Sequence, residues 1–282
     1  MRRSVMAWIG AVLLLAGRVE AQPAGRSGGA AGPGATIAQR FAPPSGFQRL
    51  PVDAESFGSY LRHLPLKPEG APVLLHDGRL KARQDVHAAV VDSELGRKDL
   101  QQCADAVMRL RAEYLYRSGQ EDAIAFDFTN GFRAEWVRWR SGERIRVTGN
   151  RCAWVHGAAP DSSHAQLMRY LDAVFTYAGT LSLARELKRA SPAPPDAGDL
   201  RIGDVFIQGG SPGHAVLVVD AARHADGRLA FLLAQGYMPA QEIHVLRNAR
   251  QPDLGAWYLL HGEARLHTPE WTFDWSHRRR WP

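Results

Sequence analysis

Residues 203–222 read GDVFIQGGSPGHAVLVVDAA, and this stretch determines the predicted architecture. Two short apolar runs flank a glycine-rich segment, and His214 is the first residue of the second run. Glycine allows the backbone to bend tightly, so the pattern predicts two strands joined as a hairpin. A titratable ring at the mouth of this hairpin is either a loop residue without a role or one half of a catalytic pair.

The strand-like pattern continues downstream, whereas helical patterns dominate upstream. RLAFLLAQG and EIHVLRN predict two more strands, the first of them joined to the preceding strand across Asp226–Gly227. Apolar residues at helical spacing predict helices upstream, at residues 56–66, 98–119, 161–177 and 180–190. The expected fold class is therefore α+β, with N-terminal helices packed on a C-terminal antiparallel β meander.

The sequence also predicts the N-caps of two helices and the character of two further segments. Asp99 is the expected N-cap of the helix that contains Cys103, and Asp161 or Ser162 caps the helix over 161–177. Residues 132–147 fit either a helix or an aromatic-rich loop. The tryptophan-rich end, residues 268–282, is expected to pack back on the core.

The N-terminus indicates export. Residues 1–21 combine a basic start, an apolar run over Met6–Gly17 and small residues at Val19 and Ala21, which predicts a signal peptide. Residues 22–40 are predicted to be a flexible linker, and residues 41–282 a single α+β domain. We therefore expect a periplasmic or secreted protein without a transmembrane segment. The oligomeric state is left open.

Composition excludes several classes of protein. The 282 residues are 45% hydrophobic and 23% charged, with a net charge of +6, which is ordinary for a globular chain. No basic stripe interleaved with aromatic residues is present, so nucleic acid is not an expected partner. Without a P-loop, GxGxxG, HExxH or CxxC pattern, no cofactor or metal is expected. Glu242, Glu263 and Glu270 are too scattered in sequence to indicate a glycosidase pair.

Cys103 is the first candidate for chemistry. A thiol near the N-terminus of a helix experiences the positive end of the helix dipole, which favours the nucleophilic thiolate. Two structural alternatives stay open. Cys103 also lies on the apolar stripe of its helix and would then be a buried small side chain, or it forms a disulfide with Cys152.

Three further residues complete a candidate site with Cys103. His214 would be held by a strand, as a general base requires. Gln235 ends the next strand and could bond the far nitrogen of the His214 ring. Gln102 and the backbone N–H of Cys103 could stabilise an oxyanion. The alternatives are a surface histidine, a polar residue that caps a strand, and an exposed helix residue.

The order of these residues resembles that in papain-like thiol hydrolases of the NlpC/P60 and CHAP types. The matching pieces are QQCADAV, GDVF, PGHAVLVVD and LLAQG. The resemblance implies a papain-like cysteine peptidase or amidase that cleaves amide bonds of peptidoglycan, with Cys103 as nucleophile and His214 as base. Cys103 and His214 are more than a hundred residues apart, farther than in those compact families, so the helix over 161–177 is expected to be an insertion.

Nearly the whole mature chain resembles a second family, the exported bacterial proteins called domain of unknown function 4846. FGSYLRHLPL, DLQQCADAVMRLRAEYLY, YAGTLSL, GDVFIQGGSPGHAVLVVD and LLAQGYMPAQEIHVL carry this resemblance. It implies that these segments form one domain, and it brings no established activity. The alternative to an enzyme is therefore a catalytically inert envelope protein of the same fold that binds a wall fragment or a partner.

Overall fold

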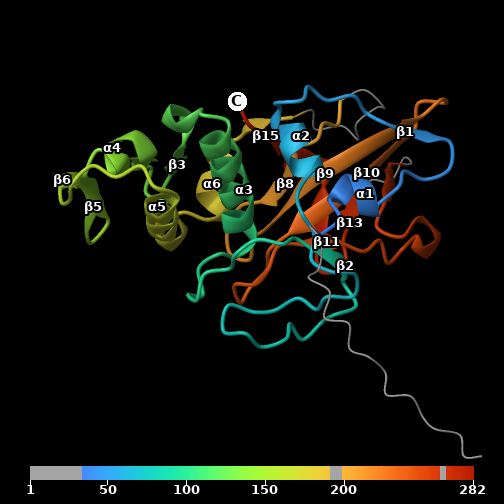
Figure 1. The fold of residues 1–282 in the computed structure, drawn as a ribbon, viewed down its shortest axis with the longest axis horizontal. Coiled ribbons are helices and arrows are strands. Elements are labelled where there is room, and N and C mark those ends of the chain that lie inside the picture. Colours follow the sequence, from blue (N-terminus) through green and yellow to red (C-terminus); the bar gives the residue numbers. More distant parts are fainter. Residues whose placement is uncertain (1–33, 191–198, 261–264) are drawn as a thin grey trace, which may run out of the picture. The chain divides into compact units, whose positions relative to one another are not determined.

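The structure is a computed structural model that describes residues 34–190, 199–260 and 265–282 (Figure 1). All of these residues belong to one of the chain's two structural units, Pro33–Pro282. The predicted signal peptide and residues 22–33 of the predicted linker lie outside the described residues. The sequence-based expectation of an α+β fold is confirmed: a large antiparallel sheet is covered by a few helices.

The four strands predicted over residues 203–248 form the centre of this sheet, paired in the order β8-β9-β10-β11. The described part of the sheet has nine strands, in the order β2-β11-β10-β9-β8-β15-β7, with β1 added to β9 and β12 to β10. These strands are β1 (Phe47–Arg49), β2 (His87–Val90), β7 (Lys188–Arg189), β8 (Val205–Gln208), β9 (His214–His224), β10 (Leu229–Gln235), β11 (His244–Leu246), β12 (Tyr258–Leu260) and β15 (Arg278–Arg280).

Strands β9 and β10 are buried on both faces, which explains their continuous apolar runs. On one face, Leu217 and Leu232 belong to the main core beneath the helices. On the other face, Val216 and Phe231 pack in a second core with the C-terminal segment. This second core includes Trp275, so the tryptophan-rich end packs back on the sheet as predicted.

Six α-helices and three small hairpins complete the described part of the chain. The helices are α1 (Ile37–Arg40), α2 (Phe57–Arg62), α3 (Cys103–Arg117), α4 (Trp136–Arg140), α5 (His164–Tyr177) and α6 (Thr180–Glu186). The hairpins pair β3 (Ala125–Asp127) with β4 (Arg133–Glu135), β5 (Glu143–Thr148) with β6 (Arg151–His156), and β13 (Arg265–His267) with β14 (Thr272–Asp274). Short 3₁₀ helices are η1 (Glu121–Ala123), η2 (Pro252–Leu254) and η3 (Trp275–His277).

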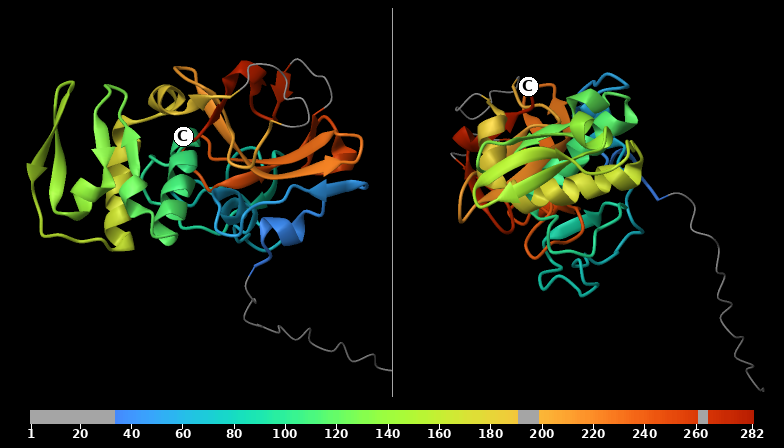
Figure 2. Two further views of the ribbon diagram at one scale, coloured as in Figure 1. Left: turned by 90° about the horizontal axis from the view of Figure 1, so that it is seen from above. Right: turned by 90° about the vertical axis from the view of Figure 1, so that its left-hand side faces the viewer.

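The segments between α3 and α6 lie beyond α3, away from the large sheet. Figures 1 and 2 show the β5–β6 hairpin at one end of the unit, with α5 between this hairpin and α3. Helix α3 itself packs against β9 and β10. The long stretch between Cys103 and His214 therefore does not separate the helix from the strands.

The structure corrects four details of the sequence-based prediction. The predicted linker ends too late, because Ile37 starts α1 and is fully buried. Gln102, not Asp99, is the N-cap of α3, and Ser163, rather than Asp161 or Ser162, caps α5. Residues 132–147, ambiguous in sequence, contribute to β4, α4 and β5. In the first two cases tertiary contacts decide: Ile37 enters the core, and the Asp99 carboxylate accepts the Ala240 N–H at 2.6 Å.

A buried ion cluster joins α2 and β1 to β9. The Asp220 side chain on β9 is completely buried and accepts hydrogen bonds from Arg62 Nε at 2.7 Å and Arg49 Nε at 2.8 Å. The Arg62 side chain is 9% exposed, whereas that of Arg49 is 25% exposed. A buried carboxylate is tolerated only while such donors surround it.

We expect Arg62→Met to lower the free energy of unfolding by about 3 kcal/mol, because Asp220 loses its more buried cationic partner. Arg49→Met, the matched control, should cost less because Arg49 is more exposed. Urea denaturation of both variants measures the difference. An Arg62→Met protein as stable as the wild type would contradict this role of the cluster.

Candidate active site

A pocket of about 600 Å³ opens where the N-terminus of α3 meets the start of β9 and the end of β10. Three of the four predicted site residues, Gln102, Cys103 and His214, line this pocket. The fourth, Gln235, lies behind His214. Other lining residues include Asp99, Asp105, Phe175, Thr180, Gly210, Ser211, Pro212, Gly213, Tyr237, Met238 and Trp271.

Cys103 is the first residue of α3 and is 6% exposed. Burial raises the pKa of its thiol to about 11, with a smaller contribution from the nearby Asp105 carboxylate, while backbone amides of Ala104 and Ala215 act in the opposite direction. The resting thiol is therefore protonated at neutral pH. Cys103 is not joined to Cys152, because both cysteines are free in the structure.

His214 and Gln235 form the contact that the strand order predicts. His214 is the first residue of β9 and Gln235 the last of β10, and antiparallel neighbours bring these two ends together. The His214 Nε2 atom lies 2.8 Å from Gln235 Oε1. Within the described part of the chain, the Nδ1 atom of the ring has no hydrogen-bond partner.

An aromatic enclosure surrounds the His214 ring. The ring centroids of Tyr237, Trp271 and Phe273 lie 5.0, 5.3 and 5.9 Å from that of His214. This burial is the main reason that the pKa of His214 falls to about 4, although the hydrogen bond to Gln235 opposes the shift. The imidazole is therefore neutral at physiological pH.

The thiol and the imidazole approach the pocket from different sides of the sheet edge. His214 packs on Phe273, which belongs to the core on the C-terminal side of the sheet. Cys103 starts the helix on the other side, where Ala104 joins the main core. Among the described residues, no hydrogen bond links Cys103 Sγ to the His214 ring, so the two groups share a pocket without forming a bonded pair.

Gln102 lines the pocket, and Asp99 holds its side-chain amide. Its side-chain Nε2 donates to Asp99 Oδ1 at 3.2 Å, and its backbone N–H donates to Asp105 Oδ2 at 3.0 Å. The backbone N–H of Cys103 belongs to the first helical residue, a position that has no partner within the helix. That N–H is thus the better oxyanion donor of the two groups predicted.

Two glycines allow the close approaches that build the pocket. A Cβ atom at Gly236, just after Gln235, would lie 2.7 Å from the Gln102 carbonyl oxygen. A Cβ atom at Gly213, just before His214, would lie 2.4 Å from Thr180 Oγ1. The Thr180 hydroxyl in turn bonds the backbone of Gly210, so α6 holds the loop that leads into β9.

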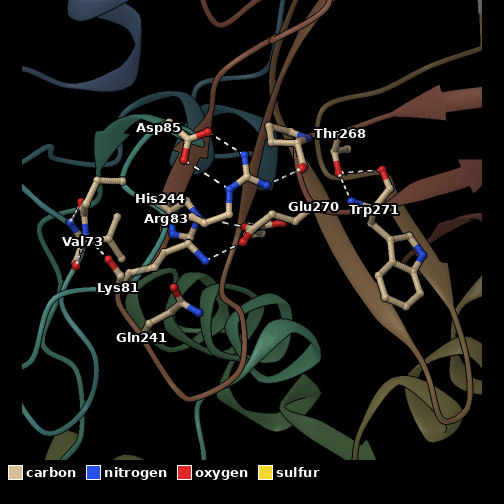
Figure 3. Close-up of polar contacts among 12 residues, drawn as sticks. Val73, Lys81, Arg83, Asp85, Gln241, His244, Thr268, Glu270 and Trp271 are labelled. Carbon is tan, nitrogen blue, oxygen red and sulfur yellow. Dashed lines mark hydrogen bonds and ion pairs between the residues drawn. The ribbon is translucent and has the colours of Figure 1, made fainter.

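Sequence reasoning missed several residues around His214. Glu270 and His244 contact the Gln235 amide, and Lys81 pairs with Glu270 (Figure 3). These residues are distant in sequence and carry no motif. The only local signal was AQGY, in which the glycine and the tyrosine directly follow the polar end of β10.

Fold and pocket together define an α+β protein with a helix-borne cysteine and a strand-borne histidine–glutamine pair. A family model described as domain of unknown function (4846) matches residues 37–280, and the chain belongs to this family. No curated protein and no solved structure gives a significant match.

Over the described residues, no helix has the length and apolar character needed to cross a membrane. The same residues contain no group of side chains suited to hold a metal ion.

The Asp105 carboxyl generates a pH-dependent prediction. Burial raises its pKa from 3.8 to about 7, so the folded protein keeps this proton to higher pH than the unfolded chain does. The contribution of this carboxyl to stability is therefore greatest below about pH 4 and is lost as the pH rises through about 7.

We expect Asp105→Asn to remove this decline and to exceed the wild type at about pH 8 by up to about 4 kcal/mol. Urea denaturation of both proteins at about pH 5 and about pH 8 measures it. A difference between the two proteins that does not change with pH would contradict the buried, proton-retaining carboxyl.

Proposed function

We propose that this protein is a papain-like cysteine hydrolase that cleaves amide bonds of peptidoglycan in the periplasm or outside the cell, where its predicted signal peptide would send it. One observation carries the proposal: Cys103, at the first position of α3, and His214, hydrogen-bonded to Gln235, line the same pocket. In this proposal Cys103 is the nucleophile, His214 the base and then the acid, and Gln235 the residue that orients the imidazole.

The reaction follows from the protonation states. Because both groups rest uncharged, His214 Nδ1 takes the proton from Cys103 Sγ as the sulfur attacks the carbonyl carbon of the amide. The Cys103 backbone N–H stabilises the oxyanion, with Gln102 beside it. His214 then gives the proton to the leaving amine, and water, activated by the same ring, hydrolyses the thioester to a carboxylate and the free thiol.

The pocket lining is compatible with a peptide substrate that carries an amine. The Asp99 carboxyl group lines the pocket, whereas no lysine or arginine is among its lining residues. Tyr237, Trp271 and the 55%-exposed Met238 add apolar surface for the rest of a peptide. Peptides of the bacterial wall combine an amine with apolar side chains.

The second candidate function is that of an inert binding protein of the same fold. Two observations favour it: the thiol has a raised pKa and the imidazole a lowered one, and no hydrogen bond joins them. The same pocket would then hold a wall peptide without cleaving it. Turnover separates the two functions, because a binding protein retains its ligand after Cys103→Ser and never releases product.

We expect purified protein to release peptides from peptidoglycan fragments, and both Cys103→Ser and His214→Ala to reduce the rate at least about 100-fold, since each removes a group that acts in the transition state. Mass spectrometry of the soluble products measures this. Cys152→Ser is the matched control and should keep full activity, because Cys152 lies on the β5–β6 hairpin, away from the pocket.

Alkylation tests the nucleophile without a substrate. In the Cys152→Ser protein, iodoacetamide should modify Cys103 at neutral pH, and adding His214→Ala should slow this reaction at least about tenfold because the base is gone. If native Cys103 is never modified at neutral pH, the hydrolase proposal fails and the binding protein remains.

A further inference from the structure

Glu270 lies on the tight turn between β13 and β14, directly behind the His214–Gln235 pair. Its Oε2 atom accepts a hydrogen bond from Gln235 Nε2 at 2.7 Å, and its Oε1 atom accepts one from Lys81 Nζ at 2.7 Å. The side chains of Lys81 and Glu270 are only 7% and 8% exposed. Figure 3 shows Lys81 and Glu270 joined in this way beside His244.

The turn that carries Glu270 is itself fixed. The Thr268 N–H bonds the Trp271 carbonyl at 2.8 Å, and Arg83 Nη1 donates to the Pro269 carbonyl at 3.1 Å (Figure 3). Trp271, which follows Glu270 in the sequence, packs on the His214 ring. The same turn therefore places Trp271 against the His214 ring and the Glu270 carboxylate against the Gln235 amide.

The chemistry of a carboxylate decides how the Gln235 amide is oriented. An ionised carboxylate paired with a lysine only accepts hydrogen bonds, so it requires the NH₂ end of the amide. A glutamine amide that turns its NH₂ end to Glu270 presents its oxygen to His214. An amide oxygen only accepts as well, so His214 Nε2 must carry the ring proton.

His244 enforces the same orientation. Its Nδ1 atom lies 2.9 Å from the Glu242 carbonyl oxygen, which can only accept, so Nδ1 carries the proton of this ring. Its Nε2 atom is then an acceptor and lies 3.3 Å from Gln235 Nε2. Burial lowers the pKa of His244 to about 3, which keeps this ring neutral.

The structure assigns Glu270 as a positioning residue: with His244, it orients the Gln235 amide so that the His214 proton stays on Nε2 and Nδ1 is the basic nitrogen. This inference deepens the proposed hydrolase, because a base at Nδ1 is what the attack by Cys103 uses. The catalytic consequence rests on the proposed function, whereas the tautomer of His214 can be measured without any substrate.

The isosteric change Glu270→Gln should invert the orientation. Lys81 only donates, so it takes the oxygen of the new amide and leaves the NH₂ end against the NH₂ end of Gln235. Rotation of the Gln235 amide relieves this contact and places a donor against His214 Nε2. The ring proton then moves to Nδ1. Because His244 opposes the rotation, we expect a mixture in which a substantial share of His214 is protonated at Nδ1.

Long-range ¹H–¹⁵N correlation spectra of the full-length protein distinguish the two tautomers, with His214→Gln used to assign the signals. The wild type should have the proton on Nε2, Glu270→Gln should be shifted toward Nδ1, and Glu270→Asp, which keeps the carboxylate, should restore the wild-type spectrum. Glu242→Gln is the matched control: Glu242 is also a buried partner of a lysine, Lys67, and its side chain does not contact Gln235.

Two results would overturn the assignment. One is a wild-type ring protonated on Nδ1, a measurement that needs no variant and so holds even if Glu270→Gln fails to fold. The other is a folded Glu270→Gln protein with an unchanged tautomer. A third result would separate the two proposals. If Glu270→Gln shows the expected tautomer shift, but the wild-type protein neither hydrolyses wall peptides nor is alkylated at Cys103, the assignment stands and the hydrolase is refuted. If the protein is a hydrolase, Glu270→Gln should lower turnover in proportion to the share of His214 that is protonated at Nδ1 and leave KM nearly unchanged.

Discussion

The antiparallel pairing of β9 with β10 is the constraint on which the pocket depends. It brings the first residue of one strand beside the last residue of the other, so His214 and Gln235 meet without any loop having to hold them. Burial of both faces keeps the pair rigid, since a shift of register by one residue would exchange the two cores. Helix α3 then needs only to pack on these strands to bring Cys103 to the same edge.

The sequence predicted those parts of the fold that depend on local pattern. The runs over 203–248 are apolar enough to specify strands, and GDVFIQGGSPGHAVLVVD placed His214 at a strand start, where the structure has it. Predictions failed where a distant partner decides. Asp99 looks like an N-cap, but Ala240, far along the chain, uses its carboxylate. Ile37 looks like linker and is core.

The same distinction separates the parts of the site that could be predicted from those that could not. Cys103, His214 and Gln235 lie at the ends of elements, where a polar or reactive residue next to an apolar run is conspicuous. Glu270 has no such context, and in the sequence it is one of several scattered carboxylates. Only the packed turn before β14 brings it to Gln235, and only the pairing of residues 81 and 270 shows why a buried carboxylate is tolerated there.

Burial disfavours the charged forms of Cys103 and His214, but it strengthens the hydrogen bonds behind His214. By withdrawing Cys103 and His214 from water it favours their uncharged forms, which works against a standing thiolate. The same burial strengthens the hydrogen bonds that run from Lys81 through Glu270 and Gln235 to His214, because a low dielectric increases each of them. A thiolate–imidazolium ion pair would place charges in this pocket at rest. A fixed tautomer of His214 instead makes Nδ1 basic while the ring stays neutral. In the proposed hydrolase, charge would form only when an electrophile is present to receive the attack of the sulfur.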